Sequence, residues 1–354
     1  MAARSSRSLR IAQVAPVGTA VKPGAGESVE ELVSLLTEEL VRRGHQVTLF
    51  ATGDSQTSAN LQAFYEHGYE DDQELWDWEF TETMHVANAC TRADEFDVMH
   101  YHSYHFALPF TPFVHIPNVQ THHAKLSPAI AAAYHYFAEV HVVVASQFQR
   151  RHFEGRPNVE LIHQGIDTEV VPFSSHPGDY LLFVGRMIAD RGPAQAVEVA
   201  AASGMPLVLA GPAEEGFEEE IAPLLDADRV TYVGRVDPTQ RDRLLAGAGA
   251  LVYPLRYPEP VGLVVIESMA CGTPVVAVGI GAVPEIVEPG RTGYLAGTWE
   301  ELAAKVPDAL LLDRAAIRAR AVERFDFRRM VDQHEQLYLR LAGDGTENGR
   351  ASAR

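Results

Sequence analysis

Two glutamates eight residues apart form the pattern in this chain with the most evident chemistry. Glu259 and Glu267 belong to residues 258–274, PEPVGLVVIESMACGTP. The apolar run between them and the glycine after it predict a loop that turns into a helix, which ends at Gly272. One carboxylate would lie on the loop and the other about a turn or more inside the helix, so the two could reach one ligand from different sides.

The beginning of this expected helix is itself a candidate binding site. The first amides of a helix have no partner within the helix, and the helix dipole favours negative charge there. A phosphate or diphosphate is therefore the ligand that we expect at this place. The amides concerned belong to Gly262, Leu263 and Val264.

Two arginines form a second candidate anion site. Arg186 and Arg191 lie five residues apart in GRMIADRG, which begins at Gly185 directly after an apolar run. Guanidinium groups donate in a fork that suits phosphate oxygens. Cations are slightly unfavourable at the beginning of a helix, so anion binding explains this placement better than an ordinary surface role does.

Histidines gather in the first half of the chain. His122 and His123 follow a strand-like run, and at most one of them should face a cleft, because neighbouring residues of an extended chain point to opposite sides. His100 and His102 would share one face of a strand, yet no carboxylate or cysteine at ligand spacing accompanies them. The sequence therefore predicts no metal site and no bound cofactor.

A capping box precedes the first expected helix. Ser28 can cap the helix and Glu31 can reach back to it. The glycines at 24 and 26 would let this loop approach a ligand closely, but Glu27 and Glu31 would repel an anion. The pattern favours a structural cap over an anion site.

The elements that must position these residues alternate between apolar strands and helical periodicity, which is typical of parallel sheets wrapped by helices. Many of the expected strands end in glycine, at the edge where open α/β sheets hold ligands. Residues 172–178 combine serine, proline and glycine and are expected to be a linker. The expected strands are 11–15, 47–51, 98–100 and 140–145 in the first half, and 180–184, 206–210, 230–233, 250–253 and 274–278 in the second.

Composition limits the class of protein. A chain of 354 residues is long for one core and natural for two domains. Its formal charge of -19 argues against nucleic acid or anionic lipid as a main partner, since both need clustered cations. Cys90 and Cys271 are expected to be free thiols in a reducing cytoplasm. No apolar run approaches the ~18 residues of a membrane span, so the sequence predicts a cytoplasmic protein.

Taken together, these motifs closely resemble glycosyltransferase family 4, the retaining nucleotide-sugar transferases with the GT-B fold. The resemblance covers most of the chain, from Ile11 to about Leu341. It rests on the two glutamates with Gly262 and Leu263 between them and on several separated matches in the right order. These matches are ACGTPVVA at 270–277, Gly185-Arg186, Gly165-Ile166-Asp167, RGHQV at 43–47, and PEIV at 284–287 with Gly293.

The resemblance implies an α/β architecture of two doubly wound Rossmann-like domains facing a cleft, with a C-terminal helix that packs back toward the N-terminal domain. The N-terminal domain, residues 1–171, would lie on the acceptor side, and residues 179–326 would bind the nucleotide-sugar. Residues 327–342 are expected to form the C-terminal helix and residues 343–354 a disordered tail.

The resemblance also implies a role for each matched residue. Arg186 and Arg191 would hold the donor diphosphate together with the amides of residues 262–264, while Gly185 would line the same site. Glu267 would bind the ribose hydroxyls and Glu259 the hydroxyls of the transferred sugar. The loop that contains Arg235 and Val236 would meet the nucleotide base, and His123 would face the transferred sugar and polarise it.

The function implied is transfer of a sugar from a nucleotide diphospho-sugar to a hydroxyl of a small-molecule or glycan acceptor, with retention at the anomeric carbon and without a metal. A glycoside hydrolase also uses paired carboxylates, but eight residues of helix separate Glu259 and Glu267 by ~12 Å, more than the ~5–5.5 Å or ~6.5–9.5 Å of a hydrolase pair. A nucleotide-sugar epimerase lacks support in these motifs.

Three departures from the family pattern keep a second interpretation open. Arg191 stands where the family usually has lysine, and Val261 replaces the usual phenylalanine. Glu27 and Ser28 fall where the family normally has two glycines, so side chains occupy a place where backbone should approach a ligand. The alternative is a nucleotide-sugar-binding protein or helper subunit that has lost transfer activity.

Overall fold

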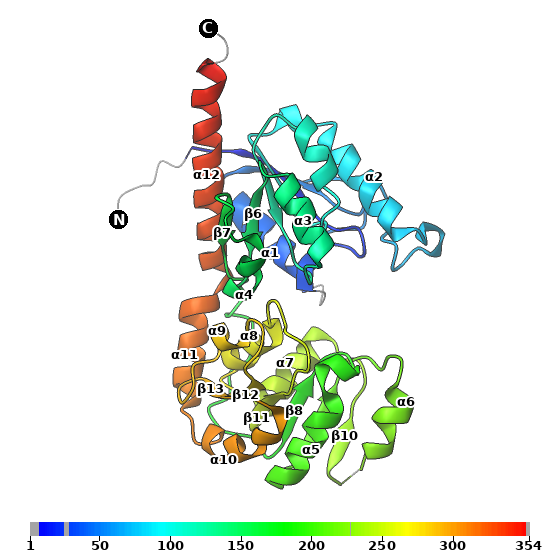
Figure 1. The fold of residues 1–354 in the computed structure, drawn as a ribbon, viewed down its shortest axis with the longest axis vertical. Coiled ribbons are helices and arrows are strands. Elements are labelled where there is room, and N and C mark those ends of the chain that lie inside the picture. Colours follow the sequence, from blue (N-terminus) through cyan, green and yellow to red (C-terminus); the bar gives the residue numbers. More distant parts are fainter. Residues whose placement is uncertain (1–6, 25–27, 227, 352–354) are drawn as a thin grey trace. The chain divides into compact units, whose positions relative to one another are not determined.

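The computed structural model describes residues 7–24, 28–226 and 228–351, and it divides the chain into two compact units (Figure 1). Unit 1 comprises residues 1–165 and 327–354, and unit 2 comprises residues 166–326. The chain enters unit 2 at Ile166, before the expected linker at 172–178. Unit 2 holds this segment firmly: the Ile166 amide donates to Phe325 O at 3.0 Å, and Arg314 Nε donates to Ser174 O at 2.8 Å.

Unit 1 is built on a sheet of seven parallel strands in the order β3-β2-β1-β4-β5-β6-β7. The strands are β1 (Arg10–Val14), β2 (Gln46–Phe50), β3 (Asn60–Gln62), β4 (Val98–Tyr101), β5 (Asn118–Thr121), β6 (His141–Val144) and β7 (Val159–Leu161). The helices are α1 (Ser28–Arg42), α2 (Trp78–Cys90), α3 (Pro128–Tyr136), α4 (Gln147–Arg150) and α12 (Phe327–Ala351).

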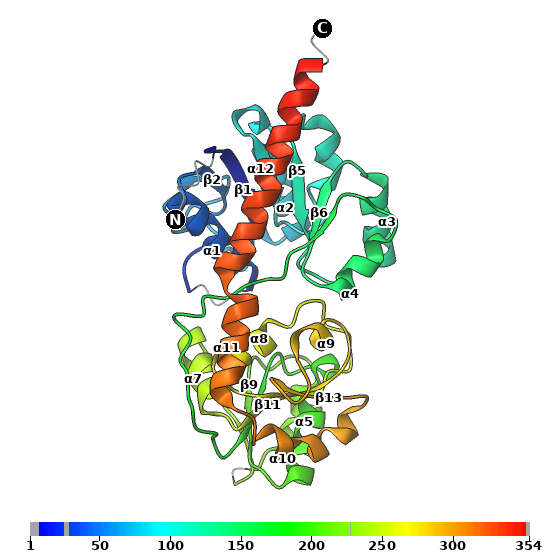
Figure 2. The same ribbon diagram turned by 90° about the vertical axis from the view of Figure 1, so that its left-hand side faces the viewer.

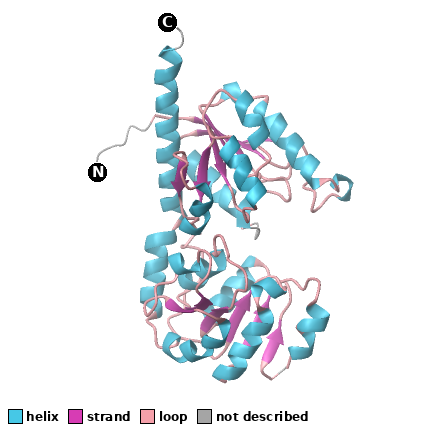
Figure 3. Cartoon of the chain, in the orientation of Figure 1, coloured by secondary structure: helices cyan, strands magenta, loops and turns pink. Residues whose placement is uncertain are grey.

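Alternating side chains of the strands fill a core on each face of this sheet. In β1, Ile11 belongs to a cluster with Leu36 of α1 and Val331 of α12, whereas Ala12 belongs to a cluster with Val86 of α2. Successive residues of a strand point to opposite faces, so α1 and α12 cover one face and α2 covers the other. Figures 2 and 3 show the helices around the strands.

Helix α12 packs on unit 1, which confirms the expected return of the C-terminal helix to the N-terminal domain. Arg43, directly after α1, donates to Asp332 and Glu335 of α12, both at 2.7 Å, and Met330 and Leu341 are buried in the shared core. The helix continues to Ala351 instead of ending at residue 342. Glycine costs a helix only about 1 kcal/mol relative to alanine, and no proline interrupts this segment.

Unit 2 has a sheet of six parallel strands in the order β10-β9-β8-β11-β12-β13. The strands are β8 (Leu181–Val184), β9 (Leu207–Ala210), β10 (Val230–Tyr232), β11 (Ala250–Tyr253), β12 (Val275–Val278) and β13 (Gly293–Ala296). The helices are α5 (Pro193–Ser203), α6 (Phe217–Glu220), α7 (Pro238–Gly247), α8 (Leu263–Ala270), α9 (Val283–Ile286), α10 (Val306–Ala309) and α11 (Arg314–Phe325). One buried cluster joins the sheet to α7, α8, α9 and α11, and a second joins it to α5, α6 and α10.

Both units are therefore open parallel sheets between two layers of helices, as the sequence predicts. Such Rossmann-like units present the carboxyl ends of all their strands at one edge, where ligands of this class of fold bind.

Candidate functional site

Helix α8 begins at Leu263, directly after Gly262. Gly262 has φ 80°, a conformation that favours glycine, and a side chain placed there would lie 3.2 Å from Ile286 Cδ1. Because glycine has no side chain, it offers no capping oxygen to the first turn. The amides at the beginning of α8 therefore lack the side-chain cap that usually satisfies them, at the place where the sequence predicts an anion site.

The loop that carries Glu259 is held in place by the loop that follows β12. The Ala282 amide donates to Glu259 O at 2.8 Å. Gly281 has φ 63°, and a Cβ at this position would lie 2.3 Å from Glu259 O. Only glycine allows the two backbones to approach this closely, so Gly281 fixes the position of Glu259. Gly281 is not among the residues predicted from the sequence, although it lies three residues before the PEIV motif.

Arg191 and Glu259 form an ion pair. Arg191 Nη1 contacts Glu259 Oε2 and also lies 3.3 Å from the Tyr253 hydroxyl. The Glu259 side chain is 16% exposed and that of Arg191 is 29% exposed, so the pair is largely shielded from water. The structure thus joins two predicted site residues that are 68 positions apart.

Arg186 has a different environment. Its side chain is 55% exposed, and its contact with Glu214 Oε2, at 3.4 Å, is long. An exposed pair of this kind contributes little to stability. Arg186 can therefore exchange Glu214 for an anionic ligand at small cost.

Glu267, inside α8, pairs with Arg241 of α7. Arg241 Nη2 lies 3.0 Å from Glu267 Oε1 and 3.2 Å from Asp242 Oδ1. Burial alone would lower the pKa of Arg241, but the charges of Glu267 and Asp242 outweigh burial and raise it. Arg241 therefore holds Glu267 in a defined orientation.

The loop after β10 completes this edge of the sheet. The Gly211 amide donates to Gly234 O at 2.8 Å, and a Cβ on Gly211 would lie 1.9 Å from Gly185 O, so the loops after β8, β9 and β10 touch through glycine backbone. Arg235 is exposed on this loop, and Val236 packs against the core. The predicted residues of unit 2 thus all follow strands at the same edge.

His123 lies in unit 1, within a chain of buried hydrogen bonds. In order from donor to acceptor, the chain runs through Gln164, His123, His102, Gln13, Tyr338, His100 and Thr121. Gln164 Nε2 lies 3.0 Å from His123 Nδ1. An amide NH₂ group can only donate, so Nδ1 accepts and the His123 proton lies on Nε2, which is 3.0 Å from His102 Nδ1.

The same argument fixes the remaining protons of the chain. His102 donates from Nε2 to Gln13 Oε1 at 2.9 Å. Gln13 Nε2 then donates to the Tyr338 hydroxyl at 3.2 Å, and this hydroxyl donates to His100 Nδ1 at 2.5 Å. His100 in turn donates from Nε2 to Thr121 Oγ1 at 2.7 Å. The chain thus links β1, β4 and β5 to α12.

Burial keeps these histidines neutral. Burial, with a smaller contribution from repulsion between the His123 ring and those of His122 and His334, lowers the pKa of His123 to about 3. Burial also lowers the pKa of His100 and His102 well below the ordinary value. Both ring nitrogens of His123 are engaged within the protein, so the ring has a fixed position, orientation and protonation state.

The described residues contain no group of three or more histidine, cysteine, aspartate or glutamate side chains arranged to hold a metal ion. In the same part of the chain, no helix has both the length and the apolar character needed to cross a membrane. Glu27 and the side chain of Ser28 lie outside the described residues, although α1 begins at Ser28.

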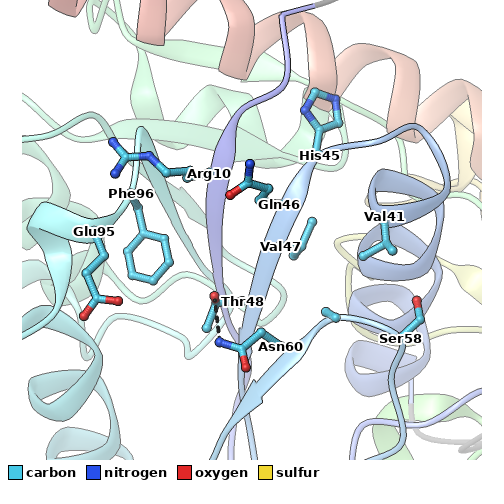
Figure 4. Close-up of a pocket in the computed structure, with 11 residues that line it drawn as sticks. Arg10, Val41, His45, Gln46, Val47, Thr48, Ser58, Asn60, Glu95 and Phe96 are labelled. Atoms are coloured by element: carbon cyan, nitrogen blue, oxygen red, sulfur yellow. Dashed lines mark hydrogen bonds between the residues drawn. The ribbon is translucent and has the colours of Figure 1, made fainter.

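A separate hollow of about 400 Å³ lies in unit 1 at the opposite edge of the sheet (Figure 4). It is lined at the amino ends of the strands, by Arg10 of β1, Gln46 of β2 and Asn60 of β3. Arg10 is already paired with Asp97 at 2.9 Å. This hollow contains none of the residues predicted to bind a ligand.

Two family models match the chain. The model described as Glycosyltransferase Family 4 matches residues 29–170, and the model described as Glycosyl transferases group 1 matches residues 171–324. The chain is 32% identical over 209 residues to a D-inositol 3-phosphate glycosyltransferase of Mycobacteroides abscessus, covering 51% of this chain and 45% of the relative. It is 31% identical over 222 residues to an alpha-maltose-1-phosphate synthase of Mycolicibacterium smegmatis, covering 52% of this chain and 57% of the relative. The chain thus matches about half the length of these curated relatives.

Solved structures share the fold over nearly the whole chain. AviGT4, a glycosyltransferase involved in avilamycin A biosynthesis, has a TM-score of 0.72 and 25% identity, covering 95% of this chain and 98% of that one. HepE of Anabaena, in complex with UDP and glucose, has a TM-score of 0.69 and 19% identity, covering 93% and 99%. The paired glutamates, the two Rossmann-like units and the two consecutive family models agree: this chain belongs to glycosyltransferase family 4 and has the GT-B fold.

Proposed function

We propose that this protein transfers a sugar from a nucleotide diphospho-sugar to an acceptor hydroxyl, with retention at the anomeric carbon and without a metal. The observation that carries the proposal is the beginning of α8, where Gly262 leaves the first amides without a side-chain cap beside the Arg191–Glu259 pair. Family membership supports the reaction class.

In this proposal the diphosphate lies against the amides of Leu263 and Val264, and Arg186 donates to its oxygens. These preorganised donors stabilise the negative charge that develops on the leaving diphosphate as the glycosidic bond breaks. Glu267, oriented by Arg241, accepts hydrogen bonds from the ribose hydroxyls. Glu259 accepts from hydroxyls of the transferred sugar, and Gly185, Arg235 and Val236 line the nucleotide end of the site.

The acceptor would attack from the face that the diphosphate leaves, and the leaving phosphate oxygen would take the acceptor's proton. Two features support this route over one that uses a protein base or nucleophile. Glu259 is paired with Arg191, which lowers the nucleophilicity of its carboxylate. His123 has a pKa of about 3 and both ring nitrogens are engaged, so we assign it a positioning role toward the sugar.

We also propose that the reaction takes place in the cytoplasm. Cys90 and Cys271 are free, and burial raises the pKa of both thiols, which keeps them in the protonated, unreactive form. Free cysteines of this kind suit a reducing compartment.

A thermal-shift panel of UDP-, GDP-, ADP- and dTDP-sugars, without metal and then with Mg²⁺, tests the proposal. A donor at ~100 times its dissociation constant adds roughly 2.7 kcal/mol to stability. We expect one nucleotide to respond without Mg²⁺, and UDP-glucose is the first probe. No response across the panel would overturn donor binding, and a response that requires Mg²⁺ would overturn metal independence.

Arg186→Ala should remove most of this donor response and leave the unliganded melting temperature unchanged, because Arg186 is exposed. Arg229→Ala is the matched control, since Arg229 is an exposed arginine just before β10, at the other edge of the sheet. Transfer is then measured as free nucleotide released only when donor and acceptor are both present. Donor binding with no release for any acceptor would indicate the non-catalytic alternative.

A further inference from the structure

An aromatic hollow of about 410 Å³ lies on unit 1, and none of the predicted site residues lines it. Its lining residues are Tyr69, Leu75, Trp76, Trp78 and Tyr104. Trp76 is 81% exposed and Trp78 is 42% exposed. Tryptophan side chains that are this exposed and lie on one surface often mark an interaction site.

The Trp78 ring is held in place by its neighbours. The Trp78 ring lies 6.3 Å from that of Tyr104 and 6.2 Å from that of Tyr69, measured between centroids. Asp77 caps α2 by accepting from the Phe80 amide at 3.1 Å, and this cap fixes the chain between the two tryptophans. The part of the hollow formed by Trp78, Tyr69 and Tyr104 is thus preorganised, which lowers the entropic cost of binding.

Tyr104 adopts a strained backbone conformation that the surrounding residues maintain. Its φ is 46°, which is unfavourable for a residue with a side chain. Gln120 Nε2 donates to Tyr104 O at 2.5 Å, and the Tyr134 hydroxyl donates to the same oxygen at 3.3 Å. Strain of this kind gathers at functional sites, where a particular side-chain direction is needed.

The hollow lies at the ligand-binding edge of the sheet of unit 1. Tyr104 follows the carboxyl end of β4. The segment that carries Tyr69 pairs with the loop after β1: the Tyr69 amide donates to Val17 O at 3.2 Å, and the Glu70 amide donates to Gly18 O at 3.1 Å. Open parallel sheets bind their ligands at this edge.

The charge around the hollow excludes one class of ligand. Residues 66–82 contain eight aspartates and glutamates and no lysine or arginine. A phosphorylated or carboxylated molecule would be repelled by this segment. Hydroxyl groups, in contrast, can donate to carboxylates and gain charge-assisted hydrogen bonds.

We propose that the aromatic hollow binds a neutral pyranose ring of the acceptor, with the apolar face of the sugar stacked on Trp76 and Trp78 and its hydroxyls donating to nearby carboxylates. The volume suits one or two sugar rings, and aromatic walls with a few polar groups are typical of small-ligand sites. The proposal rests on the proposed function, because it names the acceptor class for that reaction. In this respect the chain would differ from the relatives named for D-inositol 3-phosphate.

Tryptophan fluorescence tests the proposal directly. The chain has three tryptophans, of which Trp76 and Trp78 line the hollow and Trp299 packs against a core cluster of unit 2. We expect at least one of maltose, cellobiose, lactose and N,N′-diacetylchitobiose to change the emission in a saturable manner. Silence across these four neutral disaccharides up to ~50 mM, roughly the weak end of ligand affinity, would overturn the proposal.

Variants locate the binding surface. Trp76→Ala should weaken binding about tenfold or more, because it removes the stacking face, and Trp76→Phe should restore part of the affinity. Phe113→Ala is the matched control, since Phe113 is 79% exposed in the same unit and does not line the hollow. Equal affinity in Trp76→Ala and the native protein would overturn the proposal.

Choline is the competing probe, because aromatic residues with carboxylates also bind cations. Choline binding tighter than that of every disaccharide would overturn the proposal as well.

The test of the aromatic hollow can fail or succeed independently of the test of the proposed transferase function. The donor thermal shift depends on unit 2, whereas disaccharide binding depends on Trp76 and Trp78. A donor response without disaccharide binding would remove the acceptor assignment alone. Disaccharide binding without any donor response would leave a sugar-binding surface and remove the transferase proposal.

Discussion

His123 shows how buried neighbours determine the chemistry of a single side chain. Its Nδ1 accepts from Gln164, so its proton is directed from Nε2 to His102. A histidine with a free ring nitrogen could serve as a base, but both nitrogens of this ring are engaged within the protein, with Nδ1 as acceptor and Nε2 as donor. The hydrogen-bond chain therefore fixes the orientation and the protonation state of the His123 ring, and Gln164 is the residue that sets the direction of its proton.

Replacing Gln164 with glutamate should reverse that direction. A carboxylate accepts, so the proton of His123 should move to Nδ1, and the adjacent negative charge should raise the pKa of His123 by ~1–3 units from its value of about 3. Nitrogen-15 NMR of the histidine side chains at pH 6 measures this as a protonated-type Nδ1 resonance. Gln147→Glu, an exposed change in the same unit, is the control. An unprotonated His123 Nδ1 in Gln164→Glu would contradict the assigned direction.

The Arg191–Glu259 pair should be energetically coupled, because both side chains are largely shielded from water. In a double-mutant cycle of Arg191→Met and Glu259→Gln, we expect a coupling free energy of about 1–2 kcal/mol, measured by urea unfolding. The equivalent cycle of Arg186→Met and Glu214→Gln, at an exposed pair 3.4 Å apart, should give less than about 0.5 kcal/mol. Additive losses in the first cycle would mean that the pair does not stabilise unit 2.

At the scale of elements, α2 buries a carboxyl group against the loop that follows β1. Glu82 Oε1 accepts from the Val17 amide at 2.9 Å. Burial raises the pKa of Glu82 to about 8. A carboxyl group whose pKa is raised in the folded state contributes most to stability at a pH below its unfolded pKa. That contribution to stability is lost as the pH rises through the pKa of the folded state.

Glu82→Gln should therefore stabilise unit 1 at alkaline pH. At pH 8.5 the change removes a buried negative charge and keeps an acceptor for Val17, so we expect a gain on the order of 2–4 kcal/mol in unfolding free energy. At pH 5 Glu82 is already protonated, and the difference should be small. Glu79→Gln, exposed on the same helix, should show no such pH dependence. A loss of stability at both pH values would contradict the expected sign.

The sequence predicts the central strands because they are continuous apolar runs. The expected strand at 250–253 is β11, and the one at 206–210 is β9 with one residue fewer. Strands β3, β7 and β13 were not expected. Strand β7 is an edge strand of only three residues. Strand β3 has three residues that are exposed or half-buried, so it lacks a hydrophobic signal, and β13 is a short edge strand that begins with glycine.

The candidate site was predictable where its signal is local. Gly262 and the beginning of α8 follow from neighbouring residues, since a glycine before an apolar run indicates a helix start. The pairs Arg191–Glu259 and Arg241–Glu267 join separate elements, and nothing in the local sequence specifies which charges will meet. The hydrogen-bond chain joins Gln13 to Tyr338, 325 positions apart, and only the folded sheet with α12 on its face brings them together.

At the scale of the whole molecule, the buried histidines divide unequally between the two units. Burial lowers the pKa of eight histidines of unit 1. The shift is large for six of them, namely His85, His100, His102, His122, His123 and His334. Residues 166–326, which form unit 2, contain one histidine, His176. The two units should therefore respond differently to mild acid.

Acidification from pH 7.5 to pH 5 should destabilise unit 1 selectively. The six strongly shifted histidines remain neutral in the folded state, but they take up protons below about pH 6.5 when the chain is unfolded. Each of them therefore lowers the free energy of unfolding by up to ~1.4 kcal/mol for each pH unit below that value. Glu82 opposes this trend, but it is a single group. The fluorescence of Trp299 in a Trp76→Phe/Trp78→Phe variant reports the urea unfolding of unit 2. The fluorescence of Trp76 and Trp78 in a Trp299→Phe variant reports the urea unfolding of unit 1. We expect the midpoint of unit 1 to fall at pH 5 and that of unit 2 to stay nearly constant; an equal fall in both would show that the buried histidines do not control acid stability.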